Sequence, residues 1–257
     1  MNLDLSGSVA LVTGSASGIG ASIAQRLAES GAHVVANDID PAVEATVSAI
    51  RAAGGSAEAA IADVSDESDV AAMSAELAAR HGRLTTLVNN AGVAHFAGIE
   101  DTTPDQFDRL MGVDLRGPYL LIKQCLPLLT AAAPSSVTCI ASVHARATVP
   151  FMTGYAAAKT GLVGMVRSLA QELGPKDIRV NTVSPGFVRT PLYESWLTTE
   201  PDPEAADRRI RNMLPLRRIA DVRDVADVVA FLSSAMARCI TGADYLVDSG
   251  LTTRLMH

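Results

Sequence analysis

The stretch VALVTGSASGIG, residues 9–20, passes from an apolar segment into a turn that contains three glycines. A short apolar run bounded by glycine is typical of a buried strand. Beyond the turn, Ile19, Ile23 and Leu27 recur at helical spacing, and Gly31 follows as a stop. The stretch therefore predicts a strand, a tight turn and a helix, which is the opening unit of an α/β fold.

Outward from this unit, apolar runs that predict strands alternate with segments of helical spacing. The predicted strands are residues 33–38, 57–64, 85–92, 135–142, 178–186 and 244–248, and the predicted helices are residues 41–53, 67–80, 103–129, 154–173 and 221–234. Such alternation favours parallel strands joined by right-handed crossovers. We therefore expect a single α/β domain over residues 1–257, with a doubly wound parallel sheet of about seven strands and helices on both faces.

Residues 191–218 interrupt this alternation because they are polar and rich in proline and charge. We expect an irregular insertion over one edge of the domain, with a solvated amphipathic helix within it. Trp196 is the only tryptophan of the chain and lies in this insertion. It could close over a substrate as part of a lid, or it could anchor the insertion to the body of the protein.

Composition excludes several classes of protein. The chain is 48% hydrophobic and carries a formal net charge of -7, whereas a nucleic-acid-binding protein would normally be basic. No apolar run approaches the roughly 18 residues that span a membrane, and the first residues lead into a strand without the features of a signal peptide. Cys125, Cys139 and Cys239 are widely spaced in apolar runs, and we expect them to be reduced core residues without a disulfide or metal. We expect a soluble cytoplasmic protein with a small-molecule substrate and with neither a nucleic acid nor a membrane as partner.

The glycine-rich turn is the first candidate binding element. In doubly wound sheets, ligands bind beyond the carboxyl ends of the strands, at the point where the strand order reverses. Gly14, Gly18 and Gly20 leave room for a tight turn and expose amides at a helix start, where a pyrophosphate can bind. The spacing G-x-x-x-G-x-G differs from the G-x-G-x-x-G fingerprint, and such a turn could also be only a joint between strand and helix.

Asp38 ends the second predicted strand. A carboxylate there can accept hydrogen bonds from both ribose hydroxyls of an adenosine and repels a 2′-phosphate. No lysine or arginine occurs at residues 15–17 or 37–41 to attract that phosphate, so the pattern favours NAD over NADP. Asp38 could instead be a turn or helix-cap aspartate, although Asp40, just before Pro41, suits a cap better.

The third and fourth predicted strands also end in polar residues. Asp63 and Val64 could flank an adenine, or Asp63 could be an ordinary turn residue. Asn89 and Asn90 are adjacent at a buried strand end, which is costly unless their amides are hydrogen-bonded. We expect them to tie neighbouring strands together and to line the floor of a cofactor site.

The stretch GYAAAKTGLVGMV, residues 154–166, places Tyr155 and Lys159 one helical turn apart. Free tyrosine has a pKa near 10, too high for a good base at neutral pH, but a neighbouring ammonium stabilises the phenolate. A tyrosine so placed can exchange a proton with a substrate hydroxyl. The alternative is an exposed pair on a helix surface, and Ser142, at the preceding strand end, argues against it.

These motifs together resemble the short-chain dehydrogenase/reductase family. The matching elements stand in the order and spacing of that family and cover nearly the whole chain: TGSASGIG at residues 13–20, NNAG at 89–92, Ser142, YAAAK at 155–159, SPGFVRT at 184–190 and TGADYLVDSG at 241–250. The resemblance implies a Rossmann-like fold and NAD(P)-linked oxidation of alcohols or reduction of carbonyls. It also implies catalytic roles for Ser142, Tyr155 and Lys159, a second role for Lys159 in binding the nicotinamide ribose, and a homotetramer in which the helix that carries YAAAK packs against a partner.

The cofactor contacts that we expect combine the strand ends with this resemblance. They are Gly14, Ser17, Gly18, Ile19, Gly20, Asp38, Ile39, Asp63, Val64, Asn90, Ala91, Gly92, Tyr155, Lys159, Pro185, Gly186, Val188 and Thr190.

One position departs from the family pattern. The family usually has an asparagine in an N-L-x-G segment, thought to hold a water on the proton path to the lysine, and this chain has Asp114 in the sequence VDLRGP. An aspartate has the same shape and can accept a hydrogen bond from a water, but it cannot donate when ionised. A carboxylate near Lys159 would raise the pKa of the lysine and weaken its effect on the tyrosine. We expect the relay to survive with an altered pH optimum.

The substrate cleft is expected between residues 142–151, the loop after Gly92 and the insertion. Its candidate lining residues are Ser142, His144, His95, Met152, Phe187, Tyr193 and Trp196. His144 could bind a hydroxyl or carboxylate of the substrate, or it could be an ordinary loop histidine. The mixed polar and aromatic lining favours a small polyol, sugar or hydroxy acid over a steroid.

Three functions compete on the sequence alone. The favoured one is an NAD-dependent oxidoreductase that interconverts a secondary alcohol and its ketone with Tyr155 as general acid and base. A 3-oxoacyl-[acyl-carrier-protein] reductase would prefer NADP and offer a basic surface to its acidic carrier, so Asp38 and the net charge of -7 argue against it. A non-catalytic NAD-sensing protein would be expected to lack the tyrosine or the lysine, and both are present.

Overall fold

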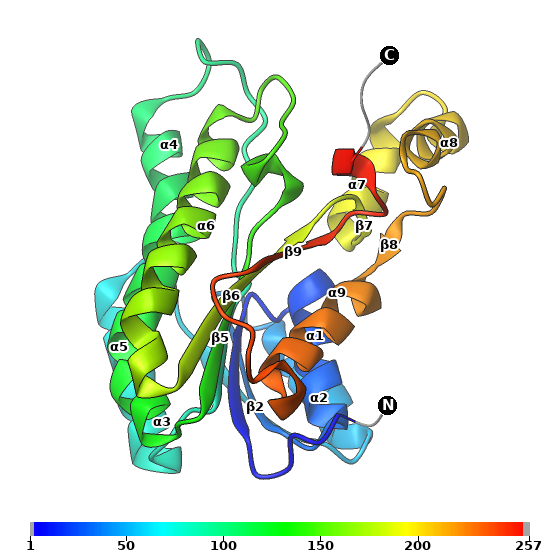
Figure 1. Cartoon of the computed structure of the whole chain (residues 1–257). Helices are drawn as coiled ribbons and strands as arrows, with labels where there is room; N and C mark the ends of the chain where they lie inside the picture. The colour runs from blue at the N-terminus through cyan, green and yellow to red at the C-terminus, as the bar shows by residue number, and fades with distance from the viewer. Residues whose placement is uncertain (1–2, 254–257) are drawn as a thin grey trace.

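The computed structural model describes residues 3–253 and shows a three-layered α/β domain, with helices on both faces of a central sheet (Figure 1). The sheet has seven strands in the order β3-β2-β1-β4-β5-β6-β9, and every pair of neighbours is parallel. The strands are β1 (Val9–Thr13), β2 (His33–Asp38), β3 (Ser56–Ile61), β4 (Thr86–Asn89), β5 (Ser135–Ile140), β6 (Ile178–Pro185) and β9 (Asp244–Val247). The doubly wound parallel sheet that the sequence predicts is thus confirmed.

The strand order reverses between β1 and β4. From β1 the chain runs outward to β2 and β3, and it then returns to place β4 on the other side of β1. The carboxyl ends of β1 and β4 therefore flank the switch point at which such sheets bind their ligands. The glycine-rich turn follows β1, and the NNAG segment begins at the last residue of β4.

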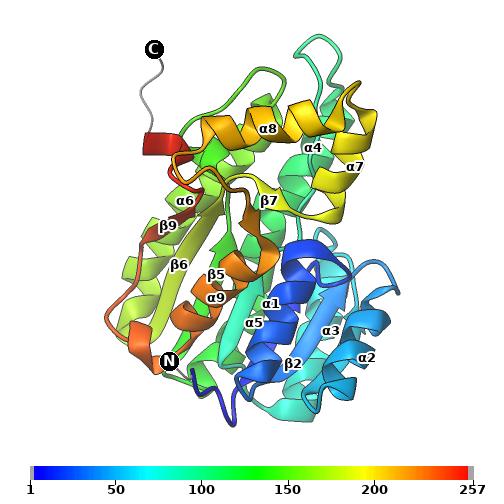
Figure 2. The same ribbon diagram turned by 90° about the vertical axis from the view of Figure 1, so that its right-hand side faces the viewer.

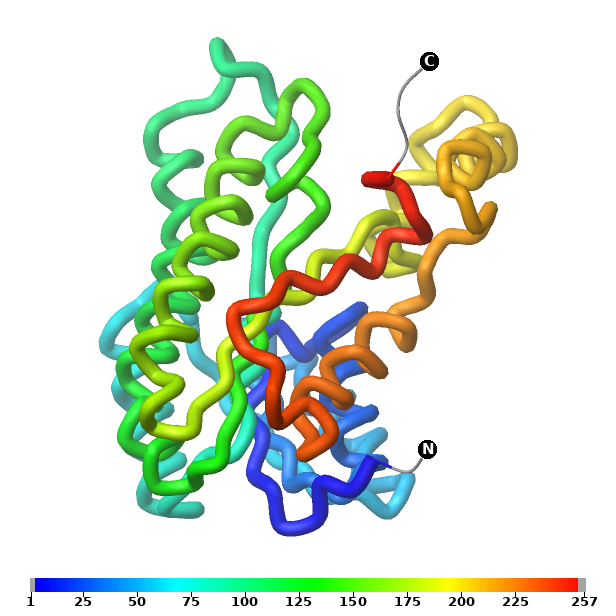
Figure 3. Tube along the Cα trace, in the orientation of Figure 1, coloured from blue at the N-terminus to red at the C-terminus, as the bar shows by residue number. Residues whose placement is uncertain are grey.

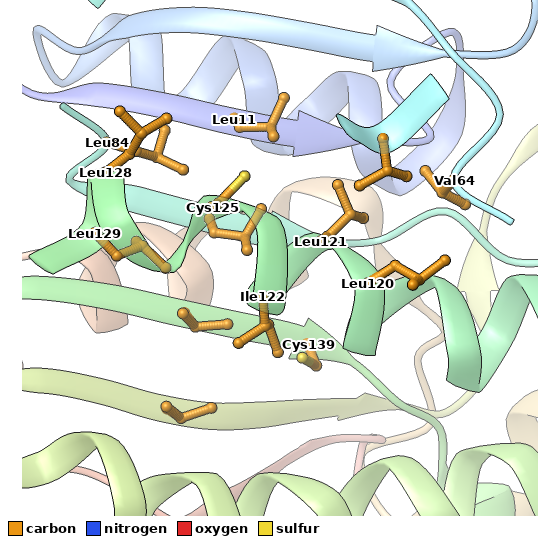
Figure 4. Packing of buried hydrophobic residues seen from close by; sticks show 14 of the residues in the cluster. Leu11, Val64, Leu84, Leu120, Leu121, Ile122, Cys125, Leu128, Leu129 and Cys139 are labelled. Atoms are coloured by element: carbon orange, nitrogen blue, oxygen red, sulfur yellow. The ribbon is translucent and has the colours of Figure 1, made fainter. Parts of the chain in front are cut away.

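Two groups of helices cover the sheet, as Figures 1 and 3 show. One face carries α1 (Gly18–Glu29), α2 (Val43–Ala52) and α9 (Val222–Ser233), and the other carries α3 (Glu67–His81), α4 (Pro104–Met111), α5 (Gly117–Ala131) and α6 (Thr153–Leu173). Both cores are continuous apolar layers. In the second, Leu121 and Cys125 of α5 pack toward Leu11 of β1, and Cys139 of β5 lies nearby (Figure 4).

Residues 191–218 contain the amphipathic helix that the sequence predicts, but they are less irregular than expected. They form α7 (Pro191–Thr199) and α8 (Pro203–Met213), which lie beyond the sheet near the short parallel strands β7 (Val188–Arg189) and β8 (Ala220–Asp221) (Figure 2). Each helix has a proline at its first position, where proline is tolerated, and a capping side chain just before it, Thr190 and Asp202. The prolines and charges thus start helices here instead of breaking them.

Two further expectations need correction. The predicted helix over residues 103–129 is divided by a π-helical turn at Gly112–Arg116, and Cys239 is exposed, whereas Cys125 and Cys139 are buried as expected. All three thiols are free. Within residues 3–253, no helix is both long and apolar enough to cross a membrane.

Candidate active site

The carboxyl ends of β1, β2 and β4 border a cavity of about 260 Å³ at the switch point. Its lining includes many of the residues that the sequence singles out for a dinucleotide, together with Arg109, which it does not. The lining residues are Gly14, Ser17, Asn37, Asp38, Ile39, Ala62, Asp63, Val64, Asn90, Ala91, Gly92, Val93, Arg109 and Val113.

The glycine-rich turn needs its glycines for two different reasons. Gly14 and Gly18 have φ angles of 66° and 57°, in the left-handed region that L side chains rarely adopt. Gly20 is required by close packing, because a Cβ there would lie 1.9 Å from the carbonyl oxygen of Gly14. The start of α1 is thereby drawn against the end of β1. Gly14 and Ser17 line the cavity, so an anion bound there would lie near the start of this helix.

Asn90 ties this turn to the neighbouring strand, as the sequence predicts. Its Nδ2 donates to the carbonyl oxygens of Thr13, at 2.9 Å, and Gly14, at 3.1 Å. The hydroxyl oxygen of Thr13 accepts in return from the backbone amides of Asn90 and Ala91, each at 3.0 Å. Among residues 3–253, the buried side chain of Asn89 makes only a long contact, 3.5 Å, from its Nδ2 to the sulfur of Cys139.

The two aspartates of the cavity are held by the backbone. Asp38 accepts from the amides of Ala16, at 2.9 Å, and Asp40, at 3.0 Å, one on each carboxylate oxygen. Since a carboxylate offers about four lone-pair sites, Asp38 retains acceptor capacity toward the cavity. Asp63 accepts from the amide and the hydroxyl of Ser65, as a turn residue would. It also lines the cavity.

Lys159 lies at the centre of the second half of the site. Its ammonium is buried, 3.0 Å from Asp114 Oδ2, and it donates to the carbonyl oxygen of Ile140 at 3.2 Å. The ammonium also lies 5.4 Å from the centroid of the Tyr155 ring, so the two side chains of the YAAAK motif do meet. Burial alone lowers the pKa of Lys159, but the attraction of Tyr155 and Asp114 outweighs it, and the net pKa is raised.

The π-helical turn positions Asp114. A π turn inserts a residue into a helix and often occurs at functional sites. Here it directs a fully buried carboxylate toward Lys159, while Asp114 Oδ1 accepts from the amide of Val93 at 2.8 Å. Gly92 provides the room, because a Cβ there would lie 3.2 Å from Asp114 Oδ2 and 3.4 Å from Lys159 Nζ.

Ser142 and His144 follow the end of β5. The Ser142 side chain is buried, and its oxygen accepts from the amide of His144 at 3.2 Å, which leaves the hydroxyl proton free to be donated. The His144 ring packs edge-on against Tyr155, with centroids 5.6 Å apart, and its Nδ1 lies 2.9 Å from the Thr148 hydroxyl. Burial lowers the pKa of His144, which favours the neutral ring beside the tyrosine.

The other candidate substrate residues are dispersed. Tyr193 is buried between α7 and α8, in a small apolar cluster that Phe187 and Trp196 border, and its hydroxyl donates to Asp207 at 3.1 Å. This packing supports the anchoring role of Trp196. His95 lines a separate small cavity beside Phe107 and Phe151, and Met152 is buried.

The strand that follows β6 brings the insertion to the cofactor side of the site. Thr190 caps α7, and its methyl carbon lies 3.7 Å from the position of a Cβ built on Gly18. Pro185 ends β6, Gly186 packs so closely on Asp248 that a Cβ would lie 3.0 Å from its Cα, and Val188 is buried in β7. Of these residues Thr190 lies beside the glycine-rich turn, and none of the four lines the cavity described above.

Two features of the site were not predicted. Arg109 shares one face of the α4 region with Val113, four residues later, and that helical spacing is the only signal in the sequence. Phe151 has a φ angle of 70°, which is strained for an aromatic residue, and its side chain is exposed beside Gly98. Nothing local in the sequence marks that backbone strain.

Comparisons with known proteins agree with this geometry. Residues 14–252 match a family model described as enoyl-(acyl carrier protein) reductase. The crystal structure of a putative short-chain dehydrogenase/reductase from Burkholderia xenovorans is similar with a TM-score of 0.93 and 36% identity, covering 98% of this chain and 99% of the other. The crystal structure of a putative NAD(P)-dependent gluconate 5-dehydrogenase from Beutenbergia cavernae, with NADP bound at low occupancy, is similar with a TM-score of 0.92 and 32% identity, covering 99% and 100%.

One curated relative is similar over nearly its whole length. The 3-oxoacyl-[acyl-carrier-protein] reductase FabG of Thermotoga maritima is 32% identical over 248 residues, which are 96% of this chain and 98% of the relative.

Proposed function

The chain belongs to the short-chain dehydrogenase/reductase family, and we propose that it interconverts a secondary alcohol and its ketone, with NAD as cofactor and Tyr155 as general acid and base. The observation that carries this proposal is the position of Lys159, whose buried ammonium lies 5.4 Å from the centroid of the Tyr155 ring. A buried cation at that distance stabilises the negative charge that develops on the tyrosine oxygen as a proton is transferred.

Each side chain has a distinct role in the proposal. Tyr155 takes the proton of the substrate hydroxyl in oxidation and returns it to the carbonyl oxygen in reduction. Ser142 donates a hydrogen bond to the same substrate oxygen, since its own oxygen already accepts from His144. Lys159 holds positive charge beside the tyrosine, and Asp114 holds Lys159. A bound nicotinamide supplies the two-electron chemistry by accepting or donating hydride.

The proposed preference for NAD over NADP rests on Asp38. The residues around the cavity fit a dinucleotide, because glycines with left-handed backbones shape the turn and a carboxylate with free acceptor sites lies at the end of β2. The charge of Asp38 would repel a 2′-phosphate, whereas Arg109, in the same lining, would attract one. We favour NAD because Asp38 ends β2 at the place where the ribose hydroxyls are read in such folds.

The proposed substrate is a small polyol, sugar or hydroxy acid. The polar groups of Ser142, His144 and Tyr155 converge near the end of β5, and the Beutenbergia cavernae neighbour is described as a putative gluconate 5-dehydrogenase. The experiment is a steady-state screen of NAD and NADP reduction with polyols, sugar acids, hydroxy acids and simple secondary alcohols. Turnover of one class with a higher kcat/KM for NAD supports the proposal, and binding of nucleotide without turnover of any of these substrates overturns it.

A 3-oxoacyl-[acyl-carrier-protein] reductase is the second candidate, favoured by the Thermotoga maritima relative. It predicts NADPH-dependent reduction of acetoacetyl-carrier protein at a higher kcat/KM than any free alcohol or ketone. The third candidate is a non-catalytic NAD sensor. If it is correct, the protein should bind NADH but turn over neither the screened alcohols nor acetoacetyl-carrier protein.

A homotetramer is part of the proposal. Leu115, Tyr119, Gly161 and Met165 form a shallow, mostly apolar depression over α5, α6 and the π-helical turn, which is a suitable surface for a second copy. Light scattering coupled to gel filtration measures the assembly, and a monomer at micromolar concentration would contradict it.

A further inference from the structure

Three side chains come together at the edge of the sheet opposite the catalytic residues. His33 is the first residue of β2, Glu58 lies in the edge strand β3, and His81 is the last residue of α3. The catalytic groups follow the carboxyl ends of the strands, whereas His33 stands at the amino end of its strand. The sequence pattern predicts no metal site here, because the three residues are far apart in the chain.

The ligand-capable atoms of these residues all lie within 4.8 Å of one another. His81 Nε2 is 2.7 Å from Glu58 Oε1, and His33 Nε2 is 3.8 Å from the same oxygen. The two imidazole rings are tilted toward each other with centroids 4.9 Å apart. Ligands of a tetrahedral zinc ion at bond lengths of about 2.0–2.1 Å are separated by roughly 3.3 Å, so small side-chain movements would complete the geometry.

His33 is oriented as metal-binding histidines usually are. Its Nδ1 lies 2.7 Å from the hydroxyl of Ser56, and such an outer hydrogen bond fixes the ring and its tautomer. Its Nε2 is buried and has no hydrogen-bond partner among residues 3–253.

Solvent access and a free carboxylate oxygen also suit a small ion. Glu58 binds Arg80 through Oε2, at 2.9 Å, and turns Oε1 toward the two histidines. The side chains of His33, Glu58 and His81 are 28%, 20% and 18% exposed, so an ion can enter from solvent while part of the site is shielded.

We propose that His33, Glu58 and His81 bind one zinc ion, with water in the fourth position. Two imidazole nitrogens and a carboxylate oxygen suit zinc and similar transition ions, whereas magnesium and calcium prefer oxygen ligands alone. The ion would fasten the end of α3 to the edge strand β3 and to β2, joining a helical layer to the sheet. This role is independent of the proposed oxidoreductase chemistry.

The test uses untagged, chelator-treated full-length protein titrated with Zn²⁺ in a calorimeter. We expect one equivalent to bind with micromolar or tighter affinity, His33→Ala and His81→Ala to weaken binding at least about 100-fold, and Ser56→Ala to weaken it about 10-fold. Glu67→Gln is the control for Glu58→Gln, because it removes the same charge from an exposed site at the other end of α3. It should bind as the parent does, whereas Glu58→Gln should bind more weakly.

A measurement on the unmodified protein guards against variants that do not fold. In the parent, Zn²⁺ should shift the ring-nitrogen NMR signals of two histidines, and the variants assign these to His33 and His81. Absence of saturable Zn²⁺ binding by the parent overturns the proposal. So does undiminished binding by a folded His33→Ala/His81→Ala double variant, or a shift confined to other histidines.

Discussion

Asp114 Oδ2 lies 3.0 Å from Lys159 Nζ, and both side chains are buried. The carboxylate occupies the place where the family pattern has an asparagine, so the ammonium faces a full negative charge on one side and the Tyr155 ring on the other. Removal of one partner of such a buried pair leaves the other charge uncompensated and lowers the stability of the protein by about 3–5 kcal/mol. A substitution at Asp114 or Lys159 is therefore expected to change both the stability of the protein and the charge that acts on Tyr155.

Asp114→Asn should shift the acid limb of the pH profile of kcat/KM for alcohol oxidation to lower pH. The amide keeps the shape and can still accept from the amide of Val93, but it removes the charge that offsets the ammonium, so the phenolate is stabilised more fully. Steady-state rates from pH 5 to 10 measure the shift. Identical profiles for the parent and the variant would show that the carboxylate does not tune the tyrosine.

The raised pKa of Lys159 has a consequence for stability. Its folded-state pKa lies above the unfolded value of about 10.4, so the contribution is fully present below that pH and is lost as pH rises through the folded value. Denaturant unfolding should show the parent losing stability relative to Lys159→Met above about pH 10.5. A constant difference between the two from pH 8 to 12 would contradict this expectation.

Tyr155→Phe should lower kcat by about 100- to 10,000-fold, the usual range for loss of a general acid or base. Binding of NADH, measured by its fluorescence, should change little, because the ring remains and only the hydroxyl is lost. Tyr245→Phe removes the same hydroxyl from a partly buried position on β9 and serves as the control. Comparable turnover by Tyr155→Phe and Tyr245→Phe would remove Tyr155 from the mechanism.

Asp38→Asn should raise the ratio of kcat/KM for NADP to that for NAD by at least about 10-fold, equivalent to about 1.4 kcal/mol. The repulsion between Asp38 and a 2′-phosphate in the cavity is removed, while the amide oxygen can still accept from one backbone amide. Asp40→Asn changes the same charge two residues away, at an exposed carboxylate that accepts from the amide of Ala42. An equal effect in both variants would assign the preference to overall charge instead of Asp38.

The fold follows from the sequence wherever a local pattern is sufficient. The bounds of β1 and β2 agree with the apolar runs that end at Thr13 and Asp38, because parallel strands buried on both faces are continuous apolar segments. Within residues 191–218 the expected amphipathic helix is present as α8, but the irregular structure expected around it is partly wrong, because proline opens each helix there and does not interrupt it. The position of each proline at the start of a helix matters more here than the overall proline and charge content.

The site is predictable only in part, because some of its contacts join residues that are distant in the sequence. Parallel topology alone brings the strand ends, and hence Gly14, Asp38 and Asn90, to one cavity. The contact between Asp114 and Lys159 follows from the sequence only through the family resemblance, because the π-helical turn that forms it has no short-range pattern. The meeting of His33, Glu58 and His81 depends on the relative lengths of two strands and a helix. Such contacts are set by packing across the domain.

Gly20→Ala should destabilise the protein by about 3 kcal/mol or more. A Cβ at this position would lie 1.9 Å from the carbonyl oxygen of Gly14 and 2.5 Å from Asn90 Nδ2, and neither the backbone nor the bonded amide can move away cheaply. The clash would separate α1 from β1 and should weaken NADH binding together with stability. Urea denaturation and fluorescence titration measure the two effects.

Gly164→Ala is the matched control, because Gly164 is an exposed residue inside α6 and a Cβ there meets nothing within 4 Å. Glycine in a helix interior is less favourable than alanine by roughly 0.5–1 kcal/mol, so this variant should gain about that much stability. The two substitutions add the same methyl group and are expected to act in opposite directions. If Gly20→Ala were as stable as Gly164→Ala and bound NADH normally, the close packing of the glycine-rich turn against β1 and Asn90 could not be what shapes the cofactor site.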